Sequence, residues 1–433
     1  MSKKVLIITY YWPPSGGPGV QRPLKFARYL PDFGWEPIIL TVRNGEYPAI
    51  DESLEKDIPP GCKVYKTKVA EPSFLYRKFT GMKKNDKIPV ANLAQKNVSW
   101  KKKLSNQIRL NLFVPDAKIG WIPYAFKQGK KIIEQEKPDI IFSTSPPPTV
   151  HLIAKKLAKW SGIKWVADFR DPWTNIHYLQ NQPICSLSKN YNKMLEANVI
   201  EKCDKATCVS QNFVDLLTTT RKPKFNIITN GFDHETDTVS TEKSNDKFTM
   251  LYIGGLTWNR YFKSFFVLLI ELIQNNILPK NNIKLVFTGS IEKTIKEEIE
   301  QLFTNHNIVE FNDYIPHTEA VTQMKKADLL LLFLEKVKGY EGHIPGKIFE
   351  YISTHNQILG IGNTKGESSA ILNETKTGKL CNPENSEEIK QELIKAYTNW
   401  EKGIIPNVEV ELIDSYSRKK LTKKLAKLFE SML

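Results

Sequence analysis

The stretch "EGHIPGKIFEY", residues 341–351, places a lysine and a glutamate at a spacing that suits a sugar phosphate. The proline and glycine before Lys347 indicate a helix that begins near this lysine, where free amide groups and the helix dipole favour a phosphate. Glu350 follows three residues later on the same helical face, where its carboxylate can accept hydrogen bonds from sugar hydroxyls. An exposed Lys–Glu pair without a binding role explains the same spacing equally well.

A glycine-rich loop near the start of the chain offers a second place for an anion. Gly16 and Gly17 lie in "SGGPGVQR", shortly after the apolar run "VLII", where a strand gives way to a helix and backbone amides can approach a ligand closely. The dinucleotide fingerprint G-x-G-x-x-G is not met, because its third glycine is replaced by Arg22. We therefore expect a ligand other than NAD.

Short runs rich in Val, Ile and Leu alternate with longer amphipathic stretches, which predicts parallel sheets covered by helices on both faces. The predicted strands are "KVLIITY", "EPIILTV", "KPDIIFSTS", "IKWVADF", "KATCVS", "FNIITN", "FTMLYIGG", "IKLVFTGS", "IVEFNDYI", "ADLLLLFL" and "QILGIGN". The series breaks once, at the polar residues 234–246, and then begins again. The sequence thus predicts two similar α/β domains, residues 1–233 and 247–410, that face each other across a cleft lined by strand-end loops.

The last segment, residues 411–433, has the pattern of an amphipathic helix, and we expect it to pack back towards the first domain. Its apolar face consists of Leu421, Leu425, Leu428 and Phe429.

Composition limits the partners and the compartment of the protein. The 433 residues include 62 Lys and Arg against 47 Asp and Glu, a net charge of +15, which indicates an anionic partner such as nucleic acid, anionic lipid or a phosphorylated substrate, or else a lysine-rich proteome. The first apolar run is too short for a secretory signal, and no later run is long enough to span a bilayer. Five cysteines without C-x-x-C pairs predict no zinc site and suit a reducing cytoplasm.

In order along the chain, "GGPGVQR", "TNGFD", "YIGGLTWNR", "IPGKIFEYIS" and "TKTGKL" resemble the motifs of retaining GT-B glycosyltransferases of family 4. "PDAKIGW", "STSPPP" and "DFRDPW" are similar to motifs of its bacterial branch, which adds sugars to surface polysaccharides and lipid-linked oligosaccharides. The resemblance covers nearly the whole chain. It implies two Rossmann-like domains, no cofactor, and transfer of a hexose-type sugar from a nucleotide diphosphate-sugar donor to a glycan or lipid-linked acceptor.

The resemblance also assigns residues to the donor. Gly16 and Gly17 match the first-domain loop that faces the donor phosphate and the acceptor. Gly254 and Gly255 match the second-domain glycines beside the diphosphate.

Arg260 and Lys263 match the basic pair that clamps the diphosphate, and Glu350 matches the second acid of an E-x₇-E motif, which usually holds the ribose. The position of the first acid holds glycine, and Glu341 lies one residue early. Fixed cations stabilise the negative charge that develops on a departing diphosphate. Because the sequence contains no Asp-x-Asp pair, we expect a clamp without a metal ion.

The motif "DFRDPW" occupies the place where the family directs residues toward the transferred sugar. Arg170 or Asp171 is expected to orient the acceptor or to stabilise oxocarbenium charge in catalysis. An internal salt bridge that caps the next helix is an equally good explanation of this motif. The resemblance requires no dedicated catalytic base, since the leaving phosphate accepts the acceptor proton.

Residues 97–112 predict a basic amphipathic helix that could rest on an anionic membrane surface at the inner face of the cell membrane. A helix that packs its apolar stripe on its own domain is the alternative. Two other functions also stay open: a nucleotide-sugar 2-epimerase of the same fold, and a basic protein that binds nucleic acid or lipid. Basic residues are spread over both halves without a recognition motif, so we expect no nucleic-acid partner.

Overall fold

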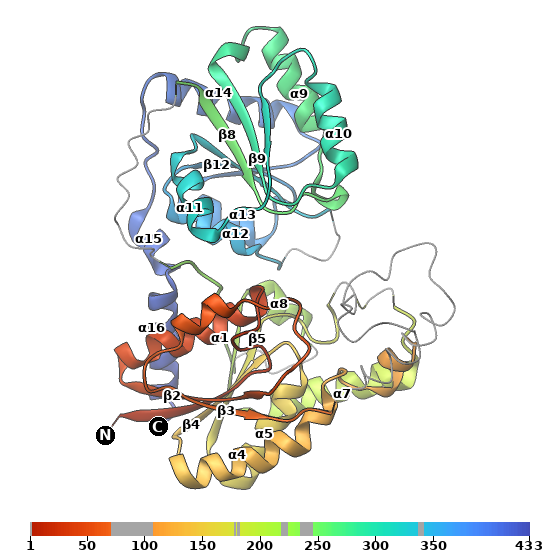
Figure 1. Cartoon of the computed structure of the whole chain (residues 1–433), viewed down its shortest axis with the longest axis vertical. Coiled ribbons are helices and arrows are strands. Elements are labelled where there is room, and N and C mark those ends of the chain that lie inside the picture. Colours follow the sequence, from red (N-terminus) through yellow and green to blue (C-terminus); the bar gives the residue numbers. More distant parts are fainter. Residues whose placement is uncertain are drawn as a thin grey trace. The chain divides into compact units, whose positions relative to one another are not determined.

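The structure is a computed structural model of the chain. It describes residues 2–70, 107–176, 179, 182–217, 224–233, 246–336 and 342–433. The chain forms two compact units, Met1–Asn230 with Arg418–Leu433, and Gly231–Ser417. Each unit is a parallel sheet with helices on both faces (Figure 1).

The first unit contains a seven-stranded sheet in the order β3-β2-β1-β4-β5-β6-β7. Its strands are β1 (Lys3–Ile8), β2 (Trp35–Val42), β3 (Lys63–Thr67), β4 (Ile140–Ser145), β5 (Lys164–Phe169), β6 (Lys205–Cys208) and β7 (Phe225–Ile227). The central strands are almost entirely buried because helices cover both faces of the sheet.

The helices of the first unit are α1 (Pro18–Tyr29), α4 (Ile122–Glu136), α5 (Thr149–Ser161), α7 (Ser186–Lys202), α8 (Gln211–Leu216) and α16 (Arg418–Glu430), with 3₁₀ turns η1 (Leu30–Phe33), η2 (Glu52–Asp57) and η3 (Ile119–Trp121). Helices α4 and α5 contribute to the core on one face of the sheet, and α1 and α16 to the core on the other. The apolar face of the last helix is buried against this unit, including Leu421, Leu425, Leu428 and Phe429.

The second unit contains a six-stranded sheet in the order β10-β9-β8-β11-β12-β13. Its strands are β8 (Phe248–Ile253), β9 (Ile283–Thr288), β10 (Val309–Asn312), β11 (Leu329–Phe333), β12 (Gln357–Ile361) and β13 (Gly378–Cys381). Its helices are α9 (Lys263–Gln274), α10 (Lys293–Leu302), α11 (His317–Lys326), α12 (Gly346–Ser353), α13 (Glu367–Glu374), α14 (Ser386–Glu401) and α15 (Val410–Ser415), with turns η5 (Trp258–Arg260) and η6 (Lys280–Asn282). Helices α9, α10 and α14 cover one face, and α11, α12 and α13 the other.

Both sheets have a topological switch point next to their first strand, because β1 lies between β2 and β4, and β8 lies between β9 and β11. Loops that leave the carboxyl ends of such neighbouring strands diverge, and ligands bind in the crevice between them. The predicted fold class, two α/β domains with parallel sheets, is confirmed. Two edge strands, β3 and β13, are not among the predicted strands.

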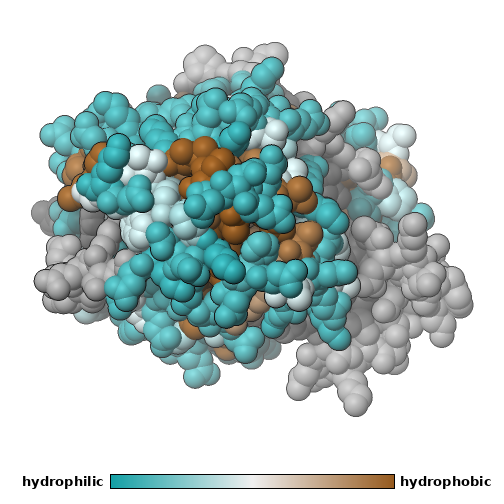
Figure 2. All heavy atoms as spheres, turned by 90° about the horizontal axis from the view of Figure 1, so that it is seen from above, coloured by the Kyte–Doolittle hydropathy of each residue, from teal (hydrophilic) through white to brown (hydrophobic). Residues whose placement is uncertain are grey.

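Within the described ranges, no helix combines the length and the apolar composition that crossing a membrane requires. The face shown in Figure 2 is largely hydrophilic, with hydrophobic residues in small groups among the polar ones.

Candidate functional site

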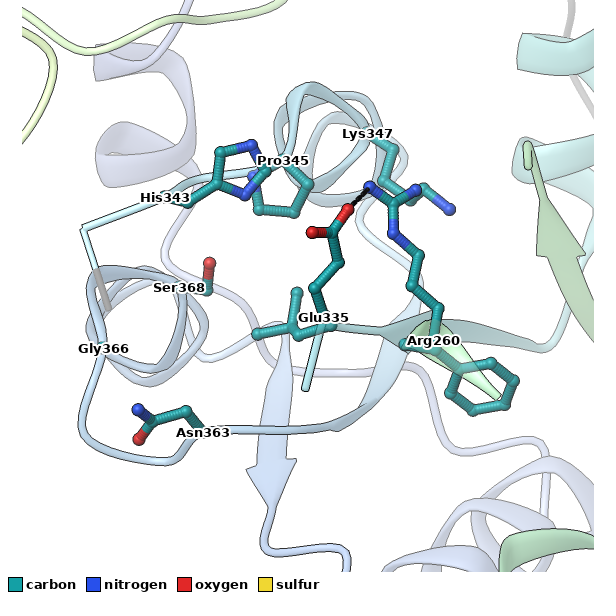
Figure 3. A pocket seen from close by; sticks show the side chains of 10 residues that line it. Arg260, Glu335, His343, Pro345, Lys347, Asn363, Gly366 and Ser368 are labelled. Carbon is teal, nitrogen blue, oxygen red and sulfur yellow. Dashed lines mark hydrogen bonds and ion pairs between the residues drawn. The ribbon is translucent and has the colours of Figure 1, made fainter. Parts of the chain in front are cut away.

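A pocket lies at the carboxyl edge of the second sheet, where loops after β8, β11 and β12 meet (Figure 3). It is lined by Arg260, Phe333, Leu334, Glu335, His343, Pro345, Lys347, Asn363, Gly366 and Ser368. The pocket therefore occupies the switch point of an open α/β sheet, where ligands of such folds bind.

Lys347 brings a buried amine without a partner to this pocket. Helix α12 begins at Gly346, which confirms the predicted helix start, and Lys347 is its second residue. The Nζ atom is buried without a hydrogen-bond partner, 4.0 Å from the centroid of the Tyr252 ring. Burial, and then the charge of Arg260, lower the pKa of Lys347 from 10.5 to about 7. An anion in the pocket would supply the acceptor that this amine lacks.

Arg260 is the second cation of the pocket, and it is paired with an acid. It ends the turn η5, and its Nη2 atom donates to Glu335 Oε1 at 2.6 Å. The two side chains are 25% and 22% exposed. Glu335, which follows the end of β11 by two residues, was not singled out from the sequence; its signal is an acid directly after the apolar run "LLLLFL".

The predicted glycines of the second unit lie beside Lys347. Gly254 has φ +113°, a conformation that side chains disfavour, and a Cβ atom there would lie 3.3 Å from Lys347 Nζ. The Tyr252 hydroxyl donates to the Gly255 carbonyl at 2.7 Å, which holds the turn in place. Gly254, Gly255, Arg260 and Lys347 are thus brought together.

Glu350 lies on the same helix as Lys347 and has a partner that the sequence did not indicate. Its Oε1 atom lies 2.9 Å from Nε2 of His317, the first residue of α11. The side chains are 32% and 58% exposed. From the sequence alone, a single histidine in a loop has no stronger interpretation than a bystander.

One other predicted donor residue, Lys263, does not line this pocket, and a second, Glu341, cannot be placed. Lys263 begins α9, is 61% exposed and pairs with Glu298 at 2.8 Å. Glu341 lies outside the described residues.

In the first unit, the predicted glycine loop sits between β1 and α1. The Gly16 amide donates to the Ala49 carbonyl at 2.8 Å. Gly17 is exposed, has φ +87°, and immediately precedes Pro18, where α1 begins.

Arg22, the residue that breaks the dinucleotide fingerprint, forms a buried ion pair with Asp168. Its Nε and Nη2 atoms donate to the two carboxylate oxygens at 3.0 and 2.8 Å, and its nitrogens also reach two backbone carbonyls. The hydroxyls of Thr144 and Thr207 donate to Asp168 at 2.7 and 2.6 Å. Burial raises the pKa of Asp168, but the charge of Arg22 and these hydrogen bonds outweigh it and lower the pKa overall.

Arg170 is also buried, and all of its nitrogens donate to backbone carbonyls. Its Nη1 atom reaches Gly19 at 2.6 Å, Nη2 reaches Pro146 at 3.3 Å, and Nε bonds Ser145. These bonds join the glycine loop to the loop after β4. Asp171 follows in sequence and is half-buried.

His151, also in the first unit, is packed against aromatic rings and contacts Ser143 Oγ at 2.8 Å through Nδ1. Burial lowers its pKa to about 3, so the imidazole is neutral near physiological pH. Its packing and its neutral state indicate a structural role.

Residues 97–106, most of the predicted membrane helix, lie outside the described part of the chain. Residues 107–112 are helical, and Ile108 and Leu112 are 41% and 74% exposed. The Asn111 side chain accepts from the Cys185 amide at 2.7 Å, which ties this helix to the start of α7.

Comparisons with solved structures find the same two-domain fold. The chain is similar to sucrose-phosphate synthase from Thermosynechococcus elongatus, with 12% identity, 99% of each chain covered and a TM-score of 0.62. It is similar to the lipopolysaccharide outer core galactosyltransferase WaaB, with 14% identity, 99% of this chain and 100% of that chain covered, and a TM-score of 0.56. It is also similar to the UDP-GlcNAc 2-epimerase from Neisseria meningitidis, with 12% identity, 98% of each chain covered and a TM-score of 0.52. At such identities the likeness shows the fold alone.

Comparisons of the sequence are more specific. No curated protein sequence matches the chain. Residues 95–236 match the family described as Glycosyltransferase Family 4, and residues 233–407 match the family described as Glycosyl transferases group 1. The two matches adjoin and together span most of the chain. With the two parallel sheets, they show that this chain is a glycosyltransferase of the GT-B fold.

Proposed function

We propose that the enzyme transfers a sugar from a nucleotide diphosphate-sugar to a glycan or lipid-linked acceptor, with retention of configuration, in the synthesis of a cell-surface polysaccharide. The observation that carries this proposal is the buried amine of Lys347, which lies without a hydrogen-bond partner beside Arg260 and at the start of α12. A diphosphate supplies the negative charge and the acceptor oxygens that this arrangement lacks.

In the proposed reaction, Arg260, Lys347 and the backbone at Gly254 and Gly255 hold the diphosphate, and Glu350 accepts hydrogen bonds from the ribose. The bond between the sugar carbon and the diphosphate oxygen breaks, and the electron pair leaves with the nucleoside diphosphate. Because negative charge grows on the phosphate in this step, the two cations stabilise the transition state more than the ground state.

The acceptor oxygen bonds the same sugar carbon from the face that the phosphate leaves, and the phosphate takes the acceptor proton. No separate base is then needed. We assign the acceptor side to the first unit, with Gly16 and Gly17 in contact with the acceptor. Arg170 and Asp171 orient the acceptor, Arg170 through the loops that its guanidinium joins.

We place the enzyme in the cytoplasm, at the inner face of the membrane, where a lipid-linked acceptor is available. Apolar side chains of α7 support this placement: Leu187, Tyr191 and Met194 follow helical spacing and are 80%, 47% and 57% exposed. Ile108 and Leu112 are exposed as well, on the short helix that Asn111 ties to the start of α7. Vesicles containing phosphatidylglycerol should bind the wild type, and Leu187→Asp with Met194→Asp should abolish binding. Ile405→Asp, an exposed apolar position of the second unit, is the control.

A thermal-shift screen against free nucleotides and nucleotide-sugars tests the donor site. We expect one nucleoside diphosphate family to stabilise the wild type by about 2.7 kcal/mol at a hundredfold excess over its Kd. Arg260→Ala and Glu350→Ala should reduce or abolish the shift. If no nucleotide shifts the wild type, the donor assignment is wrong.

Nuclear magnetic resonance of the first sugar released by slow donor hydrolysis tests retention. The anomer first released should have the configuration of the donor. Loss of the donor without transfer or release of sugar would instead indicate an epimerase.

A further inference from the structure

The pocket of the second unit has two sides of different chemistry. Arg260 and Lys347 lie on one side, and His343, Asn363 and Ser368 lie on the other (Figure 3). A diphosphate accounts for the cations. The second side has hydrogen-bonding groups and no fixed positive charge, which suits a neutral ligand with hydroxyl groups.

Ser368 is the second unsatisfied polar group of this pocket. The residue is 2% exposed, and its Oγ atom is buried without a hydrogen-bond partner. It is the second residue of α13. Among the described residues that line the pocket, only Lys347 Nζ and Ser368 Oγ are buried side-chain polar atoms without a partner. A buried hydroxyl without a partner costs free energy unless a ligand or water completes it.

Glu335 lies between the two sides. One carboxylate oxygen accepts from Arg260, and the other points toward the side that carries His343 and Ser368 (Figure 3). A carboxylate next to a diphosphate opposes that anion, so the diphosphate alone gives no reason for an acid at this position. A carboxylate that accepts hydrogen bonds from sugar hydroxyls, while Arg260 neutralises its charge, is the arrangement that uses both neighbours.

We propose that Glu335 and Ser368 recognise the sugar of the donor, with Glu335 accepting hydrogen bonds from its hydroxyls and Ser368 bonding it from the opposite wall. Arg260 then contacts both the carboxylate and the diphosphate, and so couples recognition of the sugar to the leaving group. This inference rests on the proposed function. It makes Glu335 and Ser368 specificity residues, distinct from the cations that hold the phosphates.

Calorimetric titrations can distinguish the contribution of the donor's sugar to the affinity from that of its nucleoside diphosphate. Free UDP, GDP, ADP and dTDP are compared with UDP-glucose, UDP-galactose, UDP-N-acetylglucosamine, GDP-mannose, ADP-glucose and dTDP-glucose. In the wild type, at least one conjugate should bind more tightly than its own diphosphate. Glu335→Gln should weaken that conjugate about tenfold, yet bind the free diphosphate at least as tightly as the wild type, because a negative charge beside the phosphates is removed.

Ser368→Ala should weaken the conjugate about three- to tenfold and leave the free diphosphate unchanged. Two control variants match these substitutions. Ser369→Ala changes the neighbouring buried serine, which does not line the pocket, and Glu298→Gln changes an acid paired with Lys263 outside it. Neither control should alter the binding of either ligand.

Three outcomes would count against the inference or its basis. Equal weakening of conjugate and free diphosphate by Glu335→Gln would show that Glu335 only holds Arg260, and would overturn the inference. A wild type that binds no conjugate more tightly than the diphosphate would also overturn it, while the phosphate site would stand. Failure of every diphosphate to bind would instead reject the proposed function. If Glu335→Gln does not fold, the affinities of Ser368→Ala for the conjugate and the free diphosphate test the inference in the same way.

Discussion

The switch points of the two sheets contain charged groups that are satisfied in opposite ways. In the first unit, Arg22 and Asp168 bond each other, two threonines and backbone carbonyls, and Arg170 bonds three carbonyls. In the second, the buried amine of Lys347 has no hydrogen-bond partner, and Arg260 donates to Glu335, an acid that is 22% exposed. A saturated buried cluster holds the fold together, whereas an unsaturated one is completed by a ligand.

Removing the saturated pair should have the largest effect on stability. Arg22→Ala leaves the Asp168 carboxylate buried without its counter-charge, so we expect the free energy of unfolding to fall by about 3–5 kcal/mol. Chemical denaturation measures this change in the free energy of unfolding. Arg28→Ala removes an ion pair to Asp57 at a side chain that is 44% exposed, and should cost less than about 1 kcal/mol. Equal effects of the two variants would contradict a structural role specific to Arg22.

Removing the unsaturated cation should affect binding and spare stability. Lys347→Met replaces a buried amine without a partner by an apolar side chain of similar length, so the melting temperature should stay the same or rise. Affinity for the nucleoside diphosphate should fall by about 1.5–3 kcal/mol, as measured by calorimetry.

Lys263→Met is the matched variant for Lys347→Met, because Lys263 is exposed and pairs with Glu298 outside the pocket. It should change affinity little. A larger loss of affinity in Lys263→Met than in Lys347→Met would contradict the role of Lys347. It would show that Arg260 and Lys263, the basic pair implied by the family resemblance, hold the diphosphate.

The buried amine should also make stability depend on pH. The pKa of Lys347 is about 7 in the folded ligand-free protein, against 10.5 for the ordinary group, so the unfolded chain binds more protons between these values. The free energy of unfolding should therefore rise with pH through this window. Denaturation of wild type and Lys347→Met between about pH 6 and about pH 9 isolates this contribution. Parallel curves for the two proteins would show that Lys347 does not titrate there.

The smallest effect is expected at the exposed pair of His317 and Glu350. Because both side chains are partly exposed, His317→Ala should cost less than about 1 kcal/mol in affinity for the nucleoside diphosphate. The loss should be smaller still for the 2′-deoxynucleotide, if the pair orients Glu350 toward the ribose. The same loss for both nucleotides would show that His317 acts elsewhere.

The sheets could be predicted where strands are buried on both faces, since continuous apolar runs mark them. The edge strands could not. Strand β3 is "KVYKT", with exposed and half-buried residues, and β13 is "GKLC", only four residues long. One exposed side removes the requirement for an apolar run, and so removes the signal.

The residues of the candidate site also divide into those that the sequence could predict and those that it could not. Lys347 and Glu350 could be predicted together because they lie one helical turn apart. Glu335, Ser368 and His317 could not, because each enters from a different strand end, and it is the order of the strands that brings them near. The sequence identifies Arg22 only as a departure from a glycine motif, because Arg22 lies on helix α1 and its partner Asp168 on strand β5.

Proton uptake on ligand binding tests the central claim, that the unsatisfied amine of the second unit holds the donor phosphates. The nucleoside diphosphate with the largest thermal shift is titrated into wild type and Lys347→Met at about pH 8, in two buffers of different ionisation enthalpy. The amine must gain a proton to pair with phosphate, so we predict uptake by the wild type and none by Lys347→Met, with weaker binding. Equal affinity and equal proton uptake in the two proteins would contradict the account.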